Sequence, residues 1–401
     1  MFKTVTIIGG GPTGLMAADI LSKNNYQVTV FERKPSLGRK FLLAGRGGLN
    51  ITHSEQIEFF LKKYGKNSDF LKPVINNFSP QDLQNWCKTL GEKTFKGSSG
   101  RVFPKSFKAS PLLRAWLSKL KVQKVVFKTR HDWLGWQHDE LLFKSETKHL
   151  LIKSNITVLA LGGASWPKLG SDGSWVTILK NANVKVSKLQ PSNCGFIVNW
   201  SDIFKKRFAG NPLKSIEIRF REKKIKGEFI ITSNGIEGGV IYSISSILRE
   251  TINENGFAEL VIDLKPDLKL KQIETYLSRP KFKLTTTNFL RKNLNLSDVA
   301  IGLLMELKNN LIKNMSKEKL AFNIKNFKLI VQKPFSIERS ISTAGGVSFD
   351  SIDNNFMLIT KPNVYVGGEM IDWEAPTGGY LLQACISNGA FIGNAILKKH
   401  M

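Results

Sequence analysis

Cysteine is scarce in this sequence of 401 residues. Its three cysteines are Cys87, Cys194 and Cys385, and they lie far apart without forming a CxxC pair. This spacing excludes a disulfide scaffold, a thiol-redox pair and a zinc ribbon. The histidines other than His53 show no metal-ligand spacing, so we expect no metal site. A P-loop, a nucleophile elbow and an HExxH helix are missing as well.

Long apolar runs are also missing. No stretch reaches the roughly 18 uninterrupted apolar residues of a membrane span. The first strand runs directly into a glycine turn, so no secretory signal is expected. Hydrophobic residues still make up 42% of the chain, which is enough for a sizeable core. We therefore expect a soluble, cytoplasmic protein of two or three domains, without contact to a membrane.

Acidic residues are few: 32 Asp and Glu stand against 59 Lys and Arg, which gives a net charge of +27. Such an excess predicts attraction to a polyanion such as a nucleic acid. The alternative is compositional drift toward A/T-rich codons, because 46 of the basic residues are Lys and the chain is rich in Asn and Ile. Drift alone does not require that acids be so scarce.

The start of the chain carries a dinucleotide-binding pattern. A strand over Val5–Ile8 meets a glycine-rich turn, a helix follows, and a second strand over Gln27–Phe31 ends at Glu32. The turn fits G-x-G-x-x-G, whose glycines permit a tight turn, close approach of a pyrophosphate, and helix–strand packing. An acid in the place of Glu32 accepts hydrogen bonds from ribose hydroxyls, which favours FAD or NAD over NADP. These candidates are Gly9, Gly11, Pro12, Thr13, Gly14 and Glu32.

FAD is favoured over NAD as the bound dinucleotide, because no second fingerprint follows another strand. A basic segment after Glu32 offers cations near the diphosphate, and the Ala44–Asn50 run lets backbone pass flat against a planar ring. Near the C-terminus a strand over Val364–Val366 ends in glycines, and a helix from Leu381 could point its N–H dipoles at a flavin. The further cofactor-binding candidates are Arg33, Arg39, Lys40, Arg46, Gly47, Gly48, Asn50, Gly162, Gly368, Glu369, Thr377, Gly378, Gly379 and Tyr380.

The pattern of strands and helices predicts an α/β fold. We expect a Rossmann-like domain with a parallel sheet and a β-meander, built from residues 1–190 and 335–401. Residues 191–334 form an insertion, β-rich over 195–262 and helical and Lys-rich over 266–328. Residues 55–120 have a helical pattern. The meander is expected over Val122–Lys128, Trp133–Gln137 and Leu141–Lys144.

The segment Gly38–His53 resembles the signature of the BaiN/RdsA family of FAD-dependent oxidoreductases, the HI0933-like flavoproteins. Gly100–Lys105, Thr157–Gly163, Thr343–Val347 and Pro376–Gln383 resemble other blocks of that family, in order along the chain. The resemblance implies a tightly held FAD that NAD(P)H reduces transiently. It also implies reduction of a carbon–carbon double bond conjugated with a carbonyl, either in a steroid-like enone or in a uridine of large-subunit ribosomal RNA.

The charge favours the RNA substrate over the enone, because a steroid needs no basic surface. Lysines and arginines crowd the insertion, where they could contact phosphates. Nearby Phe204, Phe208 and Phe220 could stack on bases, although core packing is the alternative for them. The RNA-binding candidates are Arg101, Lys205, Lys206, Arg207, Arg221, Lys223 and Lys224.

The expected reaction is hydride transfer from flavin N5 to uracil C6, with protonation of C5 by an acid of the protein. Cys194 is the first candidate for this acid and His53 the second, with a buried structural role as the alternative for each. Tyr380 is a further catalytic candidate, although it and Asn50 are better suited to positioning the ring. Two other functions stay open: a small-molecule enone reductase, and a non-catalytic RNA-binding flavoprotein. The oligomeric state is not encoded in any pattern that we recognise.

Overall fold

The computed structural model describes residues 3–24, 26–146, 148–280, 284–307, 312 and 315–400. The chain divides into two compact units. The interrupted unit comprises Met1–Pro191 and Ile337–Met401, and the inserted unit comprises Ser192–Ser336. The sequence places the insertion over 191–334, close to these bounds.

A five-stranded parallel sheet forms the centre of the interrupted unit, in the order β19-β10-β1-β2-β6. The residues of β10 are all buried, as are four of the five in β1. Continuous apolar strands of this kind are typical of a parallel sheet that is covered on both faces. The predicted α/β Rossmann-like fold is therefore confirmed. Its strands are β1 (Thr4–Ile8), β2 (Gln27–Glu32), β6 (Val126–Thr129), β10 (Ile156–Leu159) and β19 (Val364–Val366).

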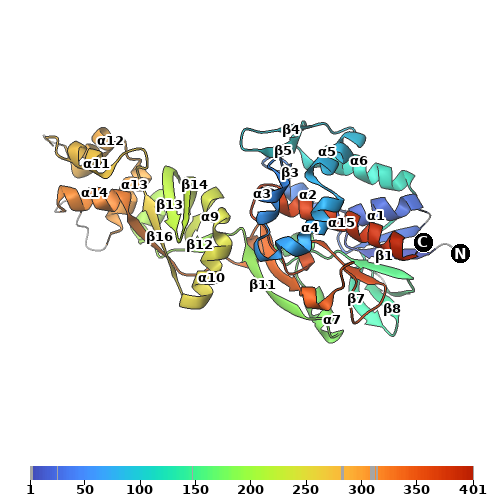
Figure 1. Cartoon of the computed structure of the whole chain (residues 1–401). Helices are drawn as coiled ribbons and strands as arrows, with labels where there is room; N and C mark the ends of the chain where they lie inside the picture. The colour runs from blue at the N-terminus through green and yellow to red at the C-terminus, as the bar shows by residue number, and fades with distance from the viewer. Residues whose placement is uncertain are drawn as a thin grey trace. The chain divides into compact units, whose positions relative to one another are not determined.

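Helix α15 (Tyr380–His400) lies beside α1 (Pro12–Leu21), as Figure 1 shows, although the two are far apart in the sequence. Glycines make this approach possible: a Cβ on Gly389 would lie 2.3 Å from the Thr13 carbonyl oxygen. By length and composition α15 could cross a membrane, yet 78% of its apolar window is buried inside the protein. It is therefore placed as a core helix. The other helices here are α2 (Arg39–Ala44), α3 (Ile57–Lys62), α4 (Ser68–Asn77), α5 (Pro80–Thr89), α6 (Ala109–Val122) and α7 (Trp175–Asn181).

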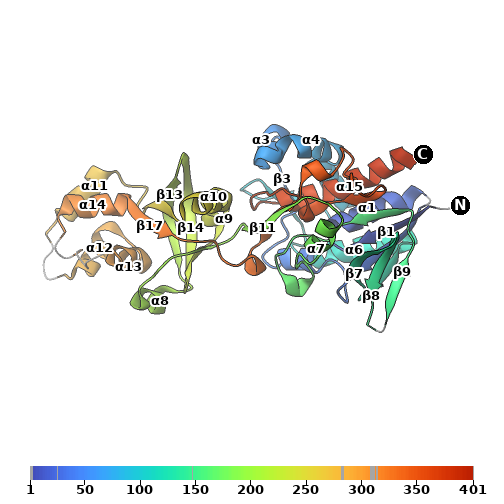
Figure 2. The ribbon, with the colours of Figure 1, turned by 90° about the horizontal axis from the view of Figure 1, so that it is seen from below.

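Two predictions about this unit were wrong in detail. The region 55–120 is not helical throughout, because β4 (Thr94–Lys96) and β5 (Arg101–Pro104) form an antiparallel sheet with β3 (Thr52–His53). The meander is also shifted along the chain. Its predicted first strand is the parallel edge strand β6, which follows directly on α6 because long-range pairing with β2 overrides the local alternation. The meander consists of β7 (Asp132–Gln137), β8 (Glu140–Lys144) and β9 (His149–Ile152), grouped beside one another in Figure 2.

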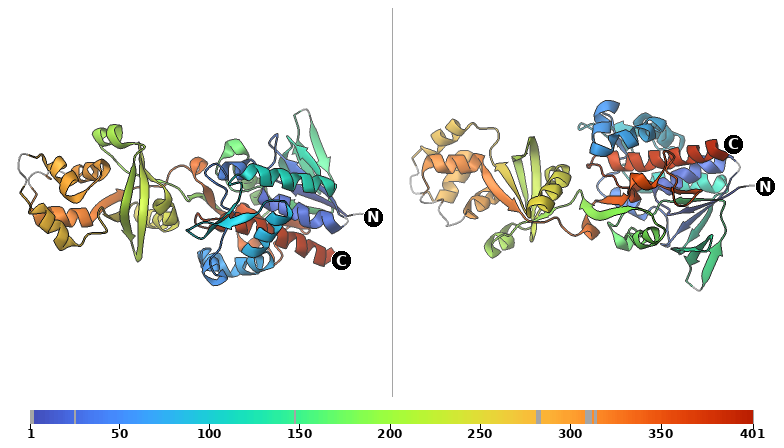
Figure 3. Two further views of the ribbon diagram at one scale, coloured as in Figure 1. Left: turned by 90° about the horizontal axis from the view of Figure 1, so that it is seen from above. Right: turned by 60° about the horizontal axis from the view of Figure 1, so that its bottom comes forward.

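The inserted unit is built on a six-stranded sheet in the order β12-β15-β14-β13-β16-β17. Helices α11–α14 gather at one end of this unit, which Figure 3 shows in orange. The stretch 195–262, which the sequence predicts to be β-rich, also contains three helices. One of them, α10, buries Leu248 on one face and carries polar residues on the other. The strands are β12 (Phe196–Ile197), β13 (Pro212–Phe220), β14 (Lys223–Thr232), β15 (Gly235–Glu237), β16 (Ala258–Asp263) and β17 (Phe327–Val331). The helices are α8 (Asp202–Phe208), α9 (Gly239–Ser243), α10 (Ser245–Asn255), α11 (Leu270–Leu277), α12 (Thr286–Leu294), α13 (Asp298–Met305) and α14 (Lys317–Lys325).

A two-stranded sheet completes the interrupted unit. It pairs β11 (Val186–Ser192), which ends at the boundary of the insertion, with β18 (Ser342–Val347), which follows the insertion. Two glycines of β18 adopt positive φ, and a Cβ on Gly345 would lie 2.2 Å from the Lys188 carbonyl oxygen. The backbones therefore approach one another as only glycine permits.

Candidate functional site

The turn between β1 and α1 brings backbone against backbone at two of its glycines. A Cβ on Gly9, whose φ is +112°, would lie 2.2 Å from the Ala160 carbonyl oxygen, and one on Gly14 would lie 2.1 Å from the Gly9 oxygen. A Cβ on Gly11 would meet nothing within 4 Å, so this glycine faces open space. Helix α1 begins there without a side-chain cap and with Pro12 in its first turn. Its N-terminus therefore presents free N–H groups and the positive end of the helix dipole.

Glu32 lies at the end of β2, where both of its carboxylate oxygens accept backbone hydrogen bonds. Oε2 accepts from the Gly10 N–H at 3.0 Å, and Oε1 accepts from the Lys34 N–H at 2.8 Å. Burial raises the pKa of this carboxyl, although the two hydrogen bonds oppose that change. The carboxylate is thus held rigidly beside the glycine turn, with lone pairs left to accept from hydroxyl groups.

A cleft of about 990 Å³, counting space open to solvent, adjoins the turn and Glu32. Ten of the residues predicted from the sequence line it: Gly9, Gly11, Pro12, Thr13, Glu32, Arg33, Arg39, Lys40, Gly162 and Glu369.

Sequence reasoning missed part of the lining of the cleft. Trp133 comes from the meander, and Ser171 and Asp172 come from the segment before α7. No local motif marks these positions, since only the tertiary fold brings them to the glycine turn. Asp172 accepts a 2.5 Å hydrogen bond from Arg33, so these two lining residues hold one another in place.

Three polar atoms on the cleft walls are buried and have no hydrogen-bond partner among the described residues: Arg39 Nε, Trp133 Nε1 and Ser171 Oγ. Buried donors without partners are costly, so such atoms indicate groups that a ligand satisfies. A ligand with many acceptor oxygens and ring nitrogens matches this donor set. Together with the open space at Gly11 and the acceptor Glu32, these atoms fit the diphosphate and ribose of a dinucleotide such as FAD.

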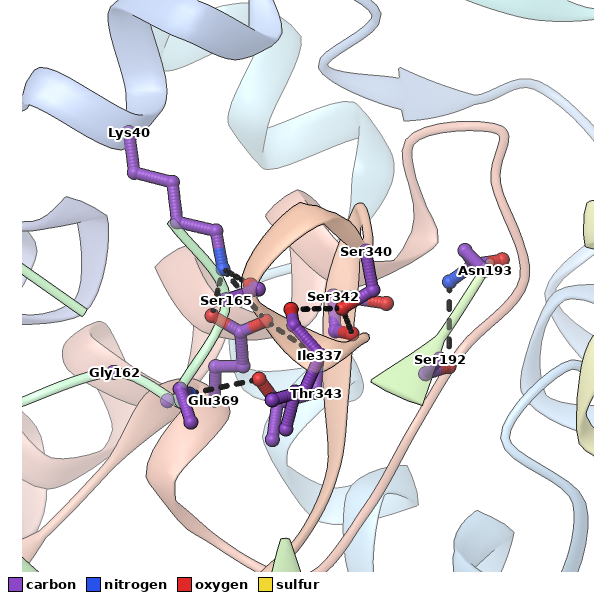
Figure 4. Close-up of polar contacts among 12 residues, drawn as sticks. Lys40, Gly162, Ser165, Ser192, Asn193, Ile337, Ser340, Ser342, Thr343 and Glu369 are labelled. Atoms are coloured by element: carbon purple, nitrogen blue, oxygen red, sulfur yellow. Dashed lines mark hydrogen bonds and ion pairs between the residues drawn. The ribbon is translucent and has the colours of Figure 1, made fainter. Parts of the chain in front are cut away.

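Lys40 does not project freely into the cleft, because its ammonium group is bound by Glu369. The Nζ atom lies 2.7 and 2.9 Å from the carboxylate oxygens and 2.5 Å from Ser165 Oγ (Figure 4). Glu369 also accepts a 3.0 Å hydrogen bond from the Thr343 N–H. Lys40 and Glu369 therefore form an ion pair with a buried carboxylate, which ties α2 to the turn after β19.

The remaining cofactor-binding candidates lie outside the lining of this cleft. Gly378 and Gly379 have φ values of +130° and +93°, and a Cβ on Gly379 would lie 2.6 Å from the Thr52 Cα. The N-terminus of α15 is thus packed against β3. Two buried atoms in the β3 region, Asn50 Oδ1 and Thr52 Oγ1, have no hydrogen-bond partner within the described residues. The group outside the lining comprises Gly14, Arg46, Gly47, Gly48, Asn50, Gly368, Thr377, Gly378, Gly379 and Tyr380.

Tyr380, the first residue of α15, is buried and donates a 2.5 Å hydrogen bond to Glu55 Oε1. Burial is the main cause that raises the pKa of Tyr380 far above its usual value, followed by the hydrogen bond to Glu55. His53 stacks on the phenol with ring centroids 5.4 Å apart. The sequence offered no signal for Glu55, since a single acid in a helical pattern is usually a solvated residue.

Both ring nitrogens of His53 are already engaged. Nε2 lies 3.0 Å from the Ser99 carbonyl oxygen, so it carries the proton, and Nδ1 accepts from the Glu55 N–H at 3.2 Å. This tautomer is assigned from the hydrogen-bond pattern. With a backbone partner at each ring nitrogen, this imidazole supports the fold of β3 and has no free N–H to offer a substrate.

Cys194 lies between β11 and β12 and is only 2% exposed. It belongs to the hydrophobic core of the inserted unit, beside residues such as Phe196. A small apolar thiol in such a core typically packs as a hydrophobe.

The RNA-binding candidates lie in three places. Arg101 is on β5 of the interrupted unit; Lys205, Lys206 and Arg207 are on α8; and Arg221, Lys223 and Lys224 are at the β13–β14 turn. Lys205 and Arg221 each have an acidic neighbour, Asp202 at 3.4 Å and Glu254 at 3.6 Å. Phe204, Phe208 and Phe220 are buried, at most 7% exposed, so they pack in the core and cannot stack on bases. Among the described residues no cluster of His, Cys, Asp or Glu could hold a metal ion.

The parallel sheet, the glycine turn and Glu32 define a dinucleotide-binding oxidoreductase of the FAD-dependent class. The chain belongs to the family described as HI0933-like protein Rossmann domain, whose family model matches residues 3–395.

Two relatives with curated names are distant but cover nearly the whole chain. A 3-dehydro-bile acid delta(4,6)-reductase of Clostridium scindens is 24% identical over 98% of this chain and 99% of its own. A ribosomal RNA dihydrouridine synthase of Haemophilus influenzae is 24% identical over 94% of each chain. Among solved structures, a 3-ketosteroid delta1-dehydrogenase of Sterolibacterium denitrificans shares the fold with a TM-score of 0.54 at 12% identity, over 99% of this chain and all of that one.

Proposed function

We propose that this protein is a reductase that converts a uridine of large-subunit (23S) ribosomal RNA to dihydrouridine, with FAD as its bound cofactor and NAD(P)H as the transient reductant. The observation that carries the cofactor assignment is the cleft at the glycine turn, where open space at Gly11 meets the acceptor Glu32. The N-terminus of α1 would hold the diphosphate, and Glu32 would accept from the adenosine ribose. When bound, FAD supplies the hydride that the protein itself cannot provide.

The reaction type is supported by two relatives with different substrates. One is named a delta(4,6)-reductase and the other a dihydrouridine synthase, and both names describe a change at a carbon–carbon double bond. In uridine the C5=C6 bond is conjugated with the C4 carbonyl, so hydride adds at C6 and a proton is then required at C5. The target base must leave its stack before it can lie against a flavin.

The proton at C5 needs a donor in the protein, and the Tyr380–Glu55 pair is the candidate that the geometry favours. Its phenol and carboxylate are joined by a 2.5 Å hydrogen bond. Glu55 also lies 3.7 Å from the ammonium of Lys63, which is 40% exposed. His53 is engaged by backbone groups, and Cys194 is enclosed in the core of the inserted unit.

The choice of RNA as substrate is supported by charge. Lys and Arg exceed Asp and Glu by 11 in residues 192–336 and by 16 in the rest of the chain. The excess is therefore carried by both units, and phosphate contacts need not be confined to the insertion. A second candidate is a conjugated enone of steroid type, which the bile acid reductase relative favours.

The test is nucleoside mass spectrometry of large-subunit ribosomal RNA from cells with and without the gene. We expect one dihydrouridine to disappear with the gene and to return with the intact gene. A Gly11→Asp variant should not restore it, whereas the matched Gly11→Ala variant should. If dihydrouridine is unchanged although the gene is expressed, the RNA assignment is wrong, and NAD(P)H oxidation by the purified protein should then be followed with conjugated steroid enones.

A further inference from the structure

Three phenylalanines form a cluster of contacting rings at the edge of the interrupted unit. Phe95 on β4, Phe103 on β5 and Phe107 just beyond β5 contact one another with ring centroids 5.1 to 5.8 Å apart. The ring of Phe107 stacks on that of Phe103 at an interplanar angle of 26°. Unlike the phenylalanines of the inserted core, these rings reach the solvent: Phe107 is 48% exposed, and the other two are partly exposed.

The backbone of Phe107 is held in an unusual conformation at this exposed position. Its φ is +61°, a left-handed conformation that is rare and costly for a bulky residue. Its ring covers Gly48, where an added Cβ would lie 3.0 Å away. The Phe107 carbonyl also accepts a 2.8 Å hydrogen bond from the Leu49 N–H. The chain therefore holds an aromatic ring at the surface in a conformation that local preferences do not favour.

Strand pairing places this cluster on the same face as the Tyr380 region. His53 pairs with Arg101, and Phe95 pairs with Phe103. Residues directly opposite one another share a face of the sheet, as do Arg101 and Phe103, which are two positions apart on β5. His53 in turn stacks on Tyr380. A continuous row of rings and one guanidinium therefore runs from the start of α15 to Phe107.

The segment that carries the three phenylalanines is basic. Residues 93–108 include five cations and no acid, and the side chains of all five are exposed. Within the described parts of the chain, no carboxylate lies within 4.0 Å of any of them. These cations are Lys93, Lys96, Arg101, Lys105 and Lys108.

We propose that the Phe107 surface, formed by Phe95, Phe103, Phe107 and these five cations, binds single-stranded RNA by stacking bases on its rings and contacting phosphates with its cations. Exposed rings beside unpaired cations are the combination that single-stranded nucleic acids need. This inference rests on the proposed function and adds to it how the RNA substrate is held. The hairpin β4–β5, which the sequence did not predict, would thereby hold RNA at a place separate from the cleft and from the inserted unit.

The experiment measures binding of a short fluorescein-labelled single-stranded RNA to the full-length protein by fluorescence anisotropy, at several KCl concentrations. We expect Phe107→Ala to weaken binding by about 5- to 150-fold, the loss of one stacked base, and Phe107→Tyr to restore it. The double change Lys105→Gln/Lys108→Gln should reduce the slope of log affinity against log salt by about 1.4.

Matched controls separate this surface from charge in general. Phe322 on α14 is 53% exposed, and Phe322→Ala should leave binding unchanged. Lys121→Gln/Lys128→Gln removes two other exposed lysines of the same unit and should change the salt slope less. If Phe107→Ala, with unaltered thermal unfolding, binds RNA as tightly as the native protein, the proposal is wrong. It is also wrong if this change weakens binding of heparin, which has no bases, as much as that of RNA.

Failure of the proposed function remains distinguishable from failure of this inference. RNA binding that depends on Phe107, together with unchanged cellular dihydrouridine, would support the surface and reject the enzymatic assignment. Loss of dihydrouridine with the gene, together with RNA binding that ignores Phe107, would do the reverse.

Discussion

Lys40 and Glu369 are 329 positions apart in the sequence, yet the ammonium of one binds both carboxylate oxygens of the other. Glu369 is 7% exposed, and Lys40 reaches it from α2 across the cleft wall. A buried carboxylate that loses its cation becomes strongly unfavourable. The fold of the cleft therefore depends on an ion pair between two segments that come from near opposite ends of the chain.

Removing Lys40 alone should destabilise the protein more than removing both charges. We expect Lys40→Met to lower the free energy of unfolding by about 3 kcal/mol, since a buried charge is left unpaired. The double variant Lys40→Met/Glu369→Gln should lose only about 1 kcal/mol, because the amide oxygen still accepts from the Thr343 N–H. Urea unfolding followed by tryptophan fluorescence measures both. A double variant as unstable as the single one would contradict this account of the pair.

The glycines of the first turn should separate folding from cofactor binding. Gly14→Ala forces a Cβ against the Gly9 carbonyl oxygen, so we expect a loss of stability of about 1–3 kcal/mol. A Cβ at Gly11 meets no atom of the described residues within 4 Å, so Gly11→Asp should leave unfolding within about 0.5 kcal/mol of the native value. It should nevertheless weaken FAD binding by roughly 100-fold through repulsion of the diphosphate. Thermal unfolding and the flavin absorbance per chain after purification report the two effects, and equal flavin content in native and Gly11→Asp protein would exclude this cleft as the FAD site.

The hydrogen bond from Tyr380 to Glu55 should contribute to stability as well as to proton transfer. Tyr380→Phe removes a bond to a charged acceptor, and we expect unfolding to become easier by about 1.5–3 kcal/mol. Tyr276→Phe is the matched control, because its hydroxyl makes no hydrogen bond among the described residues. Glu55→Gln retains an acceptor and should cost less. In the enzyme assay Tyr380→Phe should lower kcat more than KM, and an unaltered kcat would remove the pair from the reaction.

Alkaline pH should destabilise the protein through its tyrosines. Burial raises the pKa of five of the six, and it does so to about 12 for Tyr242 and Tyr365. A folded-state pKa above the unfolded value contributes stability that is complete below about pH 10 and is lost as pH rises through the folded value. The folded chain at about pH 11 should therefore show less than half of the tyrosinate absorbance of the urea-unfolded chain. Equal absorbance in both states would mean that these phenols are accessible.

Local sequence patterns predicted the centre of the fold well. The apolar runs of β1, β10 and β19 and the glycine turn each carry their information within a few residues. Strand β6 was misplaced because its alternation suits a meander as well as an edge strand, and only pairing with β2 decides between them. The hairpin β4–β5 was missed because two short strands lie between long helical patterns, although Gly97 and Gly100 mark its turn.

Only the part of the candidate site that comes from one continuous segment could be predicted from the sequence. The wall at Glu32 follows from a motif, whereas Trp133 and Ser171 reach the cleft only through tertiary folding. For the phenylalanines of the inserted unit the sequence left base stacking and core packing open, since Phe204 and Phe107 look alike in sequence but differ in burial. The spacing of glycines identifies which backbone turns can approach a phosphate, but it does not show which side chains are exposed to solvent.

The order in which the chain is synthesised determines when neighbouring strands of the parallel sheet can pair. Strand β10 emerges from the ribosome roughly 200 residues before its neighbour β19, so at about 5–20 residues per second its edge stays unpaired for about 10–40 s. During that time the nascent chain exposes an apolar, unpaired strand edge, the kind of surface on which chains aggregate. The lining of the cleft is complete only when Glu369 and Cys385 have been made, so we expect a product truncated before them to bind FAD less tightly. The yellow colour of the purified protein would thus report that a chain has been translated almost to its end.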